Sequence, residues 1–423
     1  MAVIALGGWL DRYRRSSLHL PGLPLTVVSS GGASVLGMAT GVIAARGLGP
    51  VERGELAAAI LWPTLFVSLG GFGLPQAVTY VAGRYRQAPA GVAGTALWLG
   101  LLQALAVPIA GFFLLPVVLW SQSDSVLAMS RFCLLSVVFF FVGGYASFLV
   151  QGLAHLRLWN VLRLIQPVCY LLGLVGLAVA GMLTAWNAVR VLVTAAAVYS
   201  VVSLVVLARV SHGTPRLDRR LARTMLLSGS QTFLAELAIL LNGRADQLFI
   251  TWFLLPVDLG LYAVAVGWAS SLRIVSAAIA PVAFARVASS ETTQEGTTYF
   301  RGAVHLGVLV HAILGACVLA VTPAAVVLLF GGEFAASAPA AMVLVAASML
   351  FGVKYVISDG LRGLGRPMEA TRAEWVGLIV TICALPVLLP RFGIVGAAIG
   401  TLLTNAASLA VIWVRARPPS AKA

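Results

Sequence analysis

Four polar or charged side chains stand close together inside an otherwise apolar stretch, "SGSQTFLAELAILLNGRADQLFITWFLL" (228–255). They are Glu236, Asn242, Arg244 and Asp246, and they fall within eleven residues. Guanidinium groups donate paired hydrogen bonds to phosphate or carboxylate oxygens, and carboxylates inside a membrane serve proton relays and ion pathways. Two interpretations follow: the cluster serves an anionic or ionic ligand, or Arg244 is simply neutralised by Asp246 or Glu236.

The elements around this cluster are apolar enough to lie in a membrane. Of the 423 residues, 60% are hydrophobic and only 10% are charged, whereas a soluble globular domain carries about 25% charged residues. Apolar runs of ~20 residues recur along the chain, and each is long enough to cross a hydrocarbon core of about 30 Å. The runs lack period-two alternation, which favours helices over barrel strands. The predicted fold class is an all-α polytopic membrane protein.

The apolar runs predict twelve transmembrane helices. Their expected ranges are 25–46, 57–82, 91–119, 126–151, 164–183, 189–208, 224–254, 260–285, 302–330, 336–358, 373–390 and 393–414. Only nine residues separate Asp246 from Pro256, too few to span, so the polar cluster is expected within the membrane. At 100° per residue, its charged members and Gly243 fall within an arc of about 160°, which predicts a shared helix face.

The distribution of basic residues predicts the orientation. If the N-terminus is cytoplasmic, 21 of the 28 Lys and Arg residues fall in cytoplasmic segments, as is usual for membrane proteins. The opposite side receives five, and the remaining two, Arg244 and Arg273, lie inside predicted helices; the five are Arg46, Arg53, Arg131, Arg190 and Arg391. The net charge of +14 therefore reflects topology. No basic run is interleaved with stacking aromatics, so nucleic acid is not an expected partner.

A short segment occurs twice, near the start of each half of the chain. "LGPVERGELAAA" begins at Leu48 and "LLPVDLGLYAVA" begins at Leu254, an offset of 206 residues. A repeat that contains an even number of helices places both copies in the same orientation, related by an axis along the membrane normal. We therefore expect two parallel six-helix lobes around a central cavity, which is the architecture of an alternating-access transporter.

The repeat also predicts the domain boundaries. The expected units are a cytoplasmic lead-in (1–24), an N-lobe (25–208), a basic cytoplasmic linker (209–223), a C-lobe (224–414) and a cytoplasmic tail (415–423). Glu52 and Asp258 occupy matching positions in the two repeated turns, where an acid at a helix N-terminus is favoured by the helix dipole. A structural role is expected for both.

Five segments together resemble a known family of exporters. They are "AARGLGPVERGEL", "RADQLFITWFLLPVDLGLYAVA", "LFGGEFAASAPAAMVL", "GLRGLGRP" and "FGIVGAAIGTLLTNAASLAVIWV". Together they are similar to the polysaccharide transporter family of Wzx-like oligosaccharide flippases, within the multidrug/oligosaccharidyl-lipid/polysaccharide (MOP) exporter superfamily. The resemblance implies a flippase of the bacterial plasma membrane. Its cargo would be a polyprenyl-(pyro)phosphate-linked oligosaccharide for cell-surface polysaccharide synthesis, and other polysaccharide-assembly proteins would be possible partners besides membrane lipids.

A cargo of this kind suggests roles for the charged residues inside the predicted helices. Arg244 and Arg273 are expected to line the cavity and clamp the pyrophosphate headgroup. Arg46 either meets the departing headgroup or anchors its helix at the interface. Four residues are candidates for proton or ion coupling or for charge partners: Glu236, Asp246, Asn242 and His311. For His311, and for His305 on the same helix, packing is the alternative. Lys354 and Asp359 are expected to extend to the membrane surface.

The sequence leaves several alternatives open. A lipid II flippase or a MATE-like multidrug/cation antiporter has the same fold, whereas a membrane enzyme is disfavoured because the outer loops are short and carry no catalytic constellation. No cofactor is expected. The four cysteines are widely spaced, so no metal site is expected. The energy source is open between a proton gradient, a sodium gradient and the membrane potential, which is worth about 2.3 kcal/mol per charge per 100 mV.

Overall fold

The computed structural model describes residues 23–85, 89–211 and 216–416, and within these ranges the chain forms only helices and connecting turns. Most of the predicted lead-in, part of the basic linker and most of the predicted tail lie outside the described residues. So do the basic residues predicted to be cytoplasmic at Arg12, Arg14, Arg15, Arg86, Arg417 and Lys422.

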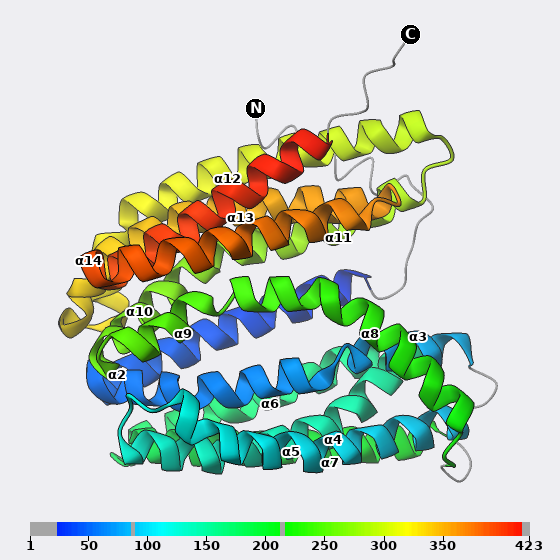
Figure 1. The fold of residues 1–423 in the computed structure, drawn as a ribbon, viewed down its shortest axis with the longest axis horizontal. Helices are drawn as coiled ribbons and strands as arrows, with labels where there is room; N and C mark the ends of the chain where they lie inside the picture. The colour runs from blue at the N-terminus through cyan, green and yellow to red at the C-terminus, as the bar shows by residue number, and fades with distance from the viewer. Residues whose placement is uncertain (1–22, 86–88, 212–215, 417–423) are drawn as a thin grey trace.

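The first half of the chain forms α2 (Leu23–Gly71), α3 (Leu74–Arg84), α4 (Pro89–Val118), α5 (Asp124–Gly152), α6 (Leu156–Val179) and α7 (Ala185–Val210). A straight α2 of 49 residues would be about 73 Å long, more than twice the hydrocarbon thickness. Instead Gly49 adopts φ 68°, and the helix runs back on itself from this point (Figure 1). Glycine reaches this left-handed region without steric cost.

The second half forms α8 (Arg219–Asn242), α9 (Ala245–Phe253), α10 (Pro256–Ala269), α11 (Arg273–Ala288), α12 (Thr293–Phe330), α13 (Ala338–Gly363) and α14 (Pro367–Ala416). Short 3-10 turns precede α11 (η1, Ser270–Leu272) and α13 (η2, Gly332–Ser337). α14 repeats the feature of α2: Gly393 has φ 54°, and the chain reverses there (Figure 1).

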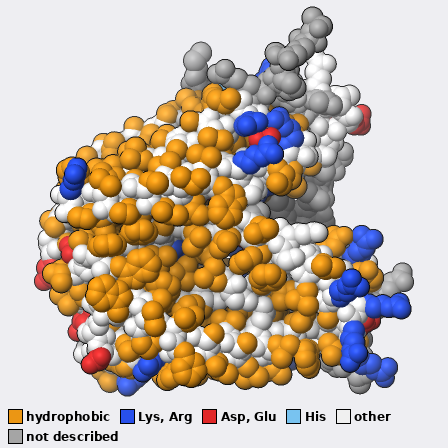
Figure 2. Space-filling view, viewed as in Figure 1, with side chains coloured by type: hydrophobic (Ala, Val, Ile, Leu, Met, Phe, Trp, Pro, Cys, Tyr) orange, Lys and Arg blue, Asp and Glu red, His pale blue; other side chains and the backbone are white. Residues whose placement is uncertain are grey.

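The number of membrane crossings agrees with the sequence-based prediction. Among the described residues, nine helices are long and apolar enough to cross a membrane, and α8, bent by 45°, brings the number to ten. Two of the ten, α2 and α14, each contain a reversal at glycine and supply two crossings, which gives twelve. Figure 2 shows a broad hydrophobic face with most charged side chains near the two ends of the helices. The protein is therefore an all-helical multi-pass membrane protein.

The helices pack as two bundles. α2 to α7 contact one another and form the N-terminal bundle, and α9 to α14 form the C-terminal bundle (Figure 1). The bundles meet at the end where α2 turns at Gly49 and α10 begins at Pro256, which we call the hairpin end. The opposite end, where α3 ends and α8 begins, is called the linker end. The lobe boundaries given by the repeat remain a prediction.

α8 belongs to both bundles. At the linker end, the Asp218 amide donates to Thr95 Oγ1 (2.9 Å), and Gly73 approaches the backbone of Gly229 closely. At its other end, Asn242 Nδ2 donates to the carbonyl oxygen of Glu374 (2.8 Å) in α14. This helix therefore links the N-terminal bundle to the polar interior of the C-terminal bundle.

Candidate functional site

A central cavity of about 500 Å³ lies between the two bundles. The N-terminal bundle contributes Ser68 and Gln76 to its wall, and α8 and α13 contribute Glu236, Tyr355 and Arg362. Much of the remaining wall is aromatic: Phe140, Phe148 and Phe233. The Arg362 guanidinium pairs with the Asp359 carboxylate (3.0 Å) in the last turns of α13. The cavity therefore has apolar walls and a few polar groups placed by both bundles, as ligand sites generally do.

A second cavity, the C-terminal pocket, adjoins the first. It has a volume of about 160 Å³, and Ile239 lines both cavities. Its polar lining comes from six helical segments, α8, α9, η1, α11, α13 and α14: Asn242, Asp246, Ser270, Arg273, Ser348, Lys354, Glu374, Thr401, Thr404 and Asn405. Two carboxylates and two cations in so small a space mark this pocket as the main polar site within the C-terminal bundle.

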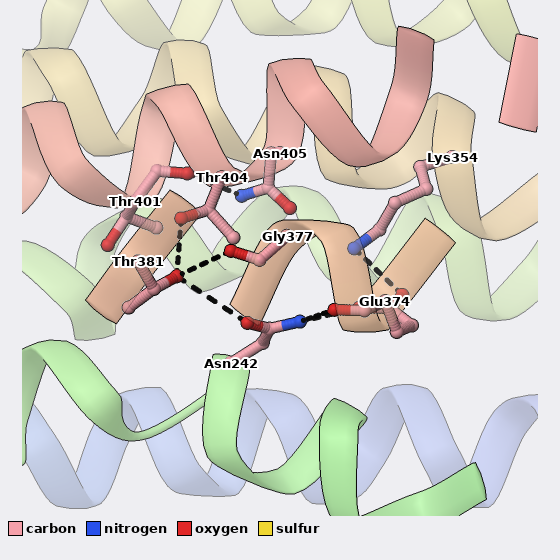
Figure 3. A network of polar contacts seen from close by, with 8 residues as sticks. All are labelled: Asn242, Lys354, Glu374, Gly377, Thr381, Thr401, Thr404 and Asn405. Atoms are coloured by element: carbon pink, nitrogen blue, oxygen red, sulfur yellow. Dashed lines mark hydrogen bonds and ion pairs between the residues drawn. The ribbon is translucent and has the colours of Figure 1, made fainter. Parts of the chain in front are cut away.

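Lys354 and Glu374 form a buried ion pair in the C-terminal pocket (Figure 3). Lys354 Nζ lies 2.8 Å from Glu374 Oε1, and the Lys354 side chain is only 3% exposed. Asn242 Nδ2 donates to the second carboxylate oxygen (3.0 Å), and Thr381 extends the network from Asn242 to Thr404 (2.6 Å). Burying two charges is costly unless both are hydrogen-bonded, and here neighbouring polar groups supply those bonds to the carboxylate.

This pair corrects one sequence-based expectation. Lys354 does not extend to the membrane surface, because its amine is held inside the bundle by Glu374 of the next helix in the chain. Sequence reasoning missed Glu374 and Arg362 as candidates. The available signal was that Glu374 and Lys354 are opposite charges at matching depth on neighbouring predicted helices.

Asp246 is buried at the start of α9 and is fully hydrogen-bonded without a basic partner. Its Oδ2 accepts from the Tyr262 hydroxyl (2.6 Å) and the Thr401 hydroxyl (3.2 Å), and its Oδ1 accepts from the Gln247 amide (2.8 Å). Arg244 forms no direct ion pair with Asp246 or Glu236 among the described residues, so the hydrogen bonds of Asp246 come from neutral groups.

Arg273 and Arg244 have different surroundings. Arg273 lines the C-terminal pocket, and its guanidinium lies 4.9 Å from the centre of the Phe351 ring. Arg244 is partly buried, donates to Gln247 Oε1 (3.3 Å), and lines neither cavity. Of the two predicted clamp residues, only Arg273 therefore lines a cavity that adjoins the space between the bundles.

The prediction that the polar cluster shares one helix face is wrong. α8 ends at Asn242, and Arg244 has φ −134°, outside the helical region, before α9 begins at Ala245. The break places Asp246 in the C-terminal pocket, whereas Glu236 faces the central cavity. The 100° periodicity assumed a continuous helix, and the chain instead divides the cluster between two adjoining cavities.

Two further candidates lie outside both cavities. Arg46 donates through Nε to the Leu329 carbonyl (2.7 Å) and through Nη2 to the Leu328 carbonyl, which joins α2 to α12 at the hairpin end. His311 is buried, with Nδ1 2.7 Å from the Gly307 carbonyl and Nε2 2.9 Å from the Ser276 hydroxyl. Arg46 thus contributes a contact between the bundles, and the surroundings of His311 are those of a packed, hydrogen-bonded side chain.

The family pattern described as "Polysaccharide biosynthesis protein" matches residues 22–284, more than half of the chain. The chain belongs to this family. No curated protein sequence matches it significantly. Membership of the polysaccharide biosynthesis protein family agrees with the resemblance inferred from the repeated and terminal segments.

Solved structures with low sequence identity share the fold of this family member. The lipid II flippase MurJ in an inward closed conformation is similar with a TM-score of 0.75 and 12% identity, over 92% of this chain and 87% of that one. An inward-facing multidrug resistance MATE family transporter of the MOP superfamily has a TM-score of 0.70 and 14% identity, over 98% and 97% of the two chains. An outward-facing MATE transporter has a TM-score of 0.63 and 14% identity, over 94% and 97%.

These similarities assign the molecule to a class. It belongs to the polysaccharide biosynthesis protein family, and it shares its fold with solved transporters of the MOP superfamily.

Proposed function

We propose that this protein flips a polyprenyl-(pyro)phosphate-linked oligosaccharide from the inner to the outer leaflet of a bacterial plasma membrane by alternating access. One observation carries the proposal: Arg273 lines a pocket that adjoins the central cavity and takes part in none of the described ion pairs. A membrane-embedded cation of this kind requires an anionic partner or water. A phosphate headgroup offers oxygens that match the guanidinium.

The orientation follows from the charge distribution. We place the linker end in the cytoplasm, because basic residues accumulate in cytoplasmic segments and 21 of the 28 fall there. Both termini are then cytoplasmic, and the hairpin end faces outward. Contacts between the bundles at the hairpin end support an inward-facing state: Ser121 Oγ and Gln122 Nε2 donate to the Thr251 carbonyl (2.8 and 2.7 Å), and Trp252 Nε1 donates to the Val118 carbonyl (2.9 Å).

The hydrogen bonding of Asp246 makes it the preferred coupling residue. Its carboxylate has three hydrogen-bond donors and no ion-paired base, so protonation or cation binding would not require breaking an ion pair. Glu374, in contrast, is held by Lys354. We propose that Asp246 couples transport to a proton or sodium gradient, with the membrane potential adding to the outward force on the anionic headgroup.

The function is tested with purified protein in liposomes that contain undecaprenyl pyrophosphate carrying a fluorescently labelled oligosaccharide. Quenching by an impermeant reductant measures how fast the label changes leaflet. Arg273→Ala is expected to slow flipping on the order of tenfold or more, because a charge-assisted hydrogen bond contributes about 1.5–3 kcal/mol. Arg244→Ala serves as the matched control and is expected to change the rate less than about twofold, since Arg244 lines neither cavity. Wild-type protein that leaves the lipid in its original leaflet would refute the function, and equal effects of the two variants would refute the role of Arg273.

A further inference from the structure

A third cavity, the N-terminal pocket, lies among α2, α5, α6 and α7. It has a volume of about 300 Å³. Its lining includes hydroxyl and amide groups together with aromatic rings: Thr64, Ser68, Ser136, Gln166, Tyr199 and Phe140. Among the residues lining this pocket there is no Asp, Glu, Lys, Arg or His. The N-terminal pocket is therefore polar without being charged, unlike the C-terminal pocket.

The polar groups of the N-terminal pocket have unused hydrogen-bonding capacity. Thr64 donates its hydroxyl proton to the Ile60 carbonyl (2.8 Å) and Ser136 donates to the Cys133 carbonyl (2.6 Å), so each oxygen keeps lone pairs to accept a bond. The Gln166 carboxamide makes no hydrogen bond to another described residue, and it offers both donors and an acceptor. Such groups in an apolar bundle require water or a ligand rich in hydroxyls.

The three cavities adjoin one another, with the central cavity in the middle. Val67, Ser68 and Phe140 line both the N-terminal pocket and the central cavity, and Ile239 lines both the central cavity and the C-terminal pocket. An extended ligand with one end in each bundle therefore meets uncharged hydroxyl and amide groups at one end and Arg273 at the other.

We propose that the N-terminal pocket binds an uncharged sugar residue of the cargo while the phosphate headgroup lies near Arg273; this rests on the proposed function. Sugar hydroxyls both donate and accept hydrogen bonds, and the faces of Phe140 and Tyr199 are apolar surfaces against which a sugar ring packs. Small-molecule sites begin at about 300 Å³, so the pocket accommodates one sugar residue and not a whole oligosaccharide. A uronic acid is disfavoured because no Lys, Arg or His lines the pocket to pair with its carboxylate.

The test uses full-length protein in nanodiscs and measures the Kd of undecaprenyl pyrophosphate bearing zero, one or three neutral sugars. Wild type is expected to bind at least one glycosylated lipid about tenfold more tightly than the bare lipid, as one or two added hydrogen bonds would give. Gln166→Ala and Thr64→Val should reduce this ratio towards one and leave the Kd of the bare lipid unchanged.

Thr194→Val is the matched control, because Thr194 also donates to a carbonyl four residues earlier (Arg190, 2.9 Å) but does not line the pocket. A thermal melt of each variant shows whether it is folded, and a variant that fails to fold is replaced by Tyr199→Phe. If wild type binds neither bare nor glycosylated lipid, the proposed function fails. If both lipids bind wild type equally, or if the ratio survives in the folded pocket variants, the sugar site is refuted and the function stands. A glucuronate-bearing lipid that binds as tightly as the neutral ones would refute the restriction to uncharged sugars.

Discussion

Gly54 and Gly260, which occupy matching positions of the sequence repeat, lie against each other's hairpins at the interface between the two bundles. A Cβ on Gly54 would overlap the Pro256 carbonyl oxygen, and a Cβ on Gly260 would overlap the Pro50 carbonyl oxygen. The reciprocal contact is what a two-fold axis between related bundles produces. Any side chain at either position would force the hairpins apart.

Gly260→Val is therefore expected to open the hairpin end. The reporter is Thr251→Cys in a background that lacks the four native cysteines, because Thr251 is buried beside the interbundle hydrogen bonds. The rate of its reaction with an impermeant thiol reagent should rise about tenfold or more, which corresponds to the cost of about 1–3 kcal/mol, or more, of overpacking a close contact. Gly267→Ala, in the same helix with no atom within 4 Å of its Cβ, should leave the rate unchanged. An unchanged rate in Gly260→Val would show that this contact does not hold the hairpin end closed.

Breaking the Lys354–Glu374 pair from either side should destabilise the fold. Lys354→Met or Glu374→Gln leaves its buried partner uncompensated, which costs about 3–5 kcal/mol, whereas the double variant should lose much less than the sum of the two. Denaturant unfolding in a mild detergent measures the free energies. Arg372→Met supplies the control, because Arg372 is 58% exposed in its pair with Glu369 and such pairs contribute about 0–1 kcal/mol. Strict additivity of the two single variants would contradict the coupling.

Replacing Arg273 by lysine should separate the contribution of the positive charge to lipid binding from that of the planar guanidinium. Lysine keeps the positive charge but loses the planar pair of donors that fits phosphate oxygens. We expect Arg273→Lys to bind undecaprenyl pyrophosphate about three- to tenfold more weakly than wild type and Arg273→Ala to bind more weakly still. Isothermal titration at two salt concentrations makes the comparison. Equal affinities for lysine and alanine variants would show that the charge at this position contributes nothing.

Asp246→Asn should abolish coupling to the ion gradient. The amide keeps an oxygen that accepts from Tyr262 but cannot take up a proton or hold a cation by charge. Flipping in liposomes is compared with and without imposed proton or sodium gradients, and the wild-type stimulation should disappear in the variant. His311→Gln should retain the stimulation, because His311 contacts only Ser276 and a backbone carbonyl among its described hydrogen bonds. If stimulation persists in Asp246→Asn, the coupling group lies elsewhere.

Much of the fold was predictable because it depends on length and polarity alone. Apolar runs predicted the twelve crossings, and the repeated Pro and Gly residues predicted the turns, including the reversal that follows Gly49. The candidate site was less predictable. A periodic pattern cannot show that a helix breaks at Arg244, so Glu236 was placed beside Asp246 although the two side chains line different cavities.

The second limit on prediction was that the sequence does not show which side chains of different helices contact each other. Lys354 and Glu374 are opposite charges at matching depth on neighbouring predicted helices, but the sequence does not show that these helices turn the two side chains towards each other. The sequence did not predict the N-terminal pocket. A serine or threonine hydroxyl in a helix can donate its hydrogen bond to the backbone carbonyl of the preceding turn, so the same residue is found whether it faces lipid or a cavity. Thr64 and Thr194 illustrate this, with nearly identical hydrogen bonds and different surroundings.

The contact between Gly54 and Gly260 joins two halves of one polypeptide and not two identical subunits. In a homodimer every substitution would be copied across the axis, and both pockets would necessarily carry the same side chains. A single chain is free of that constraint, so the pocket in one half can carry charged side chains while the pocket in the other half carries only uncharged ones. Unlike ends give the binding space a direction, and a molecule with a charged head and a neutral body can then be accepted in one orientation and refused in the reverse.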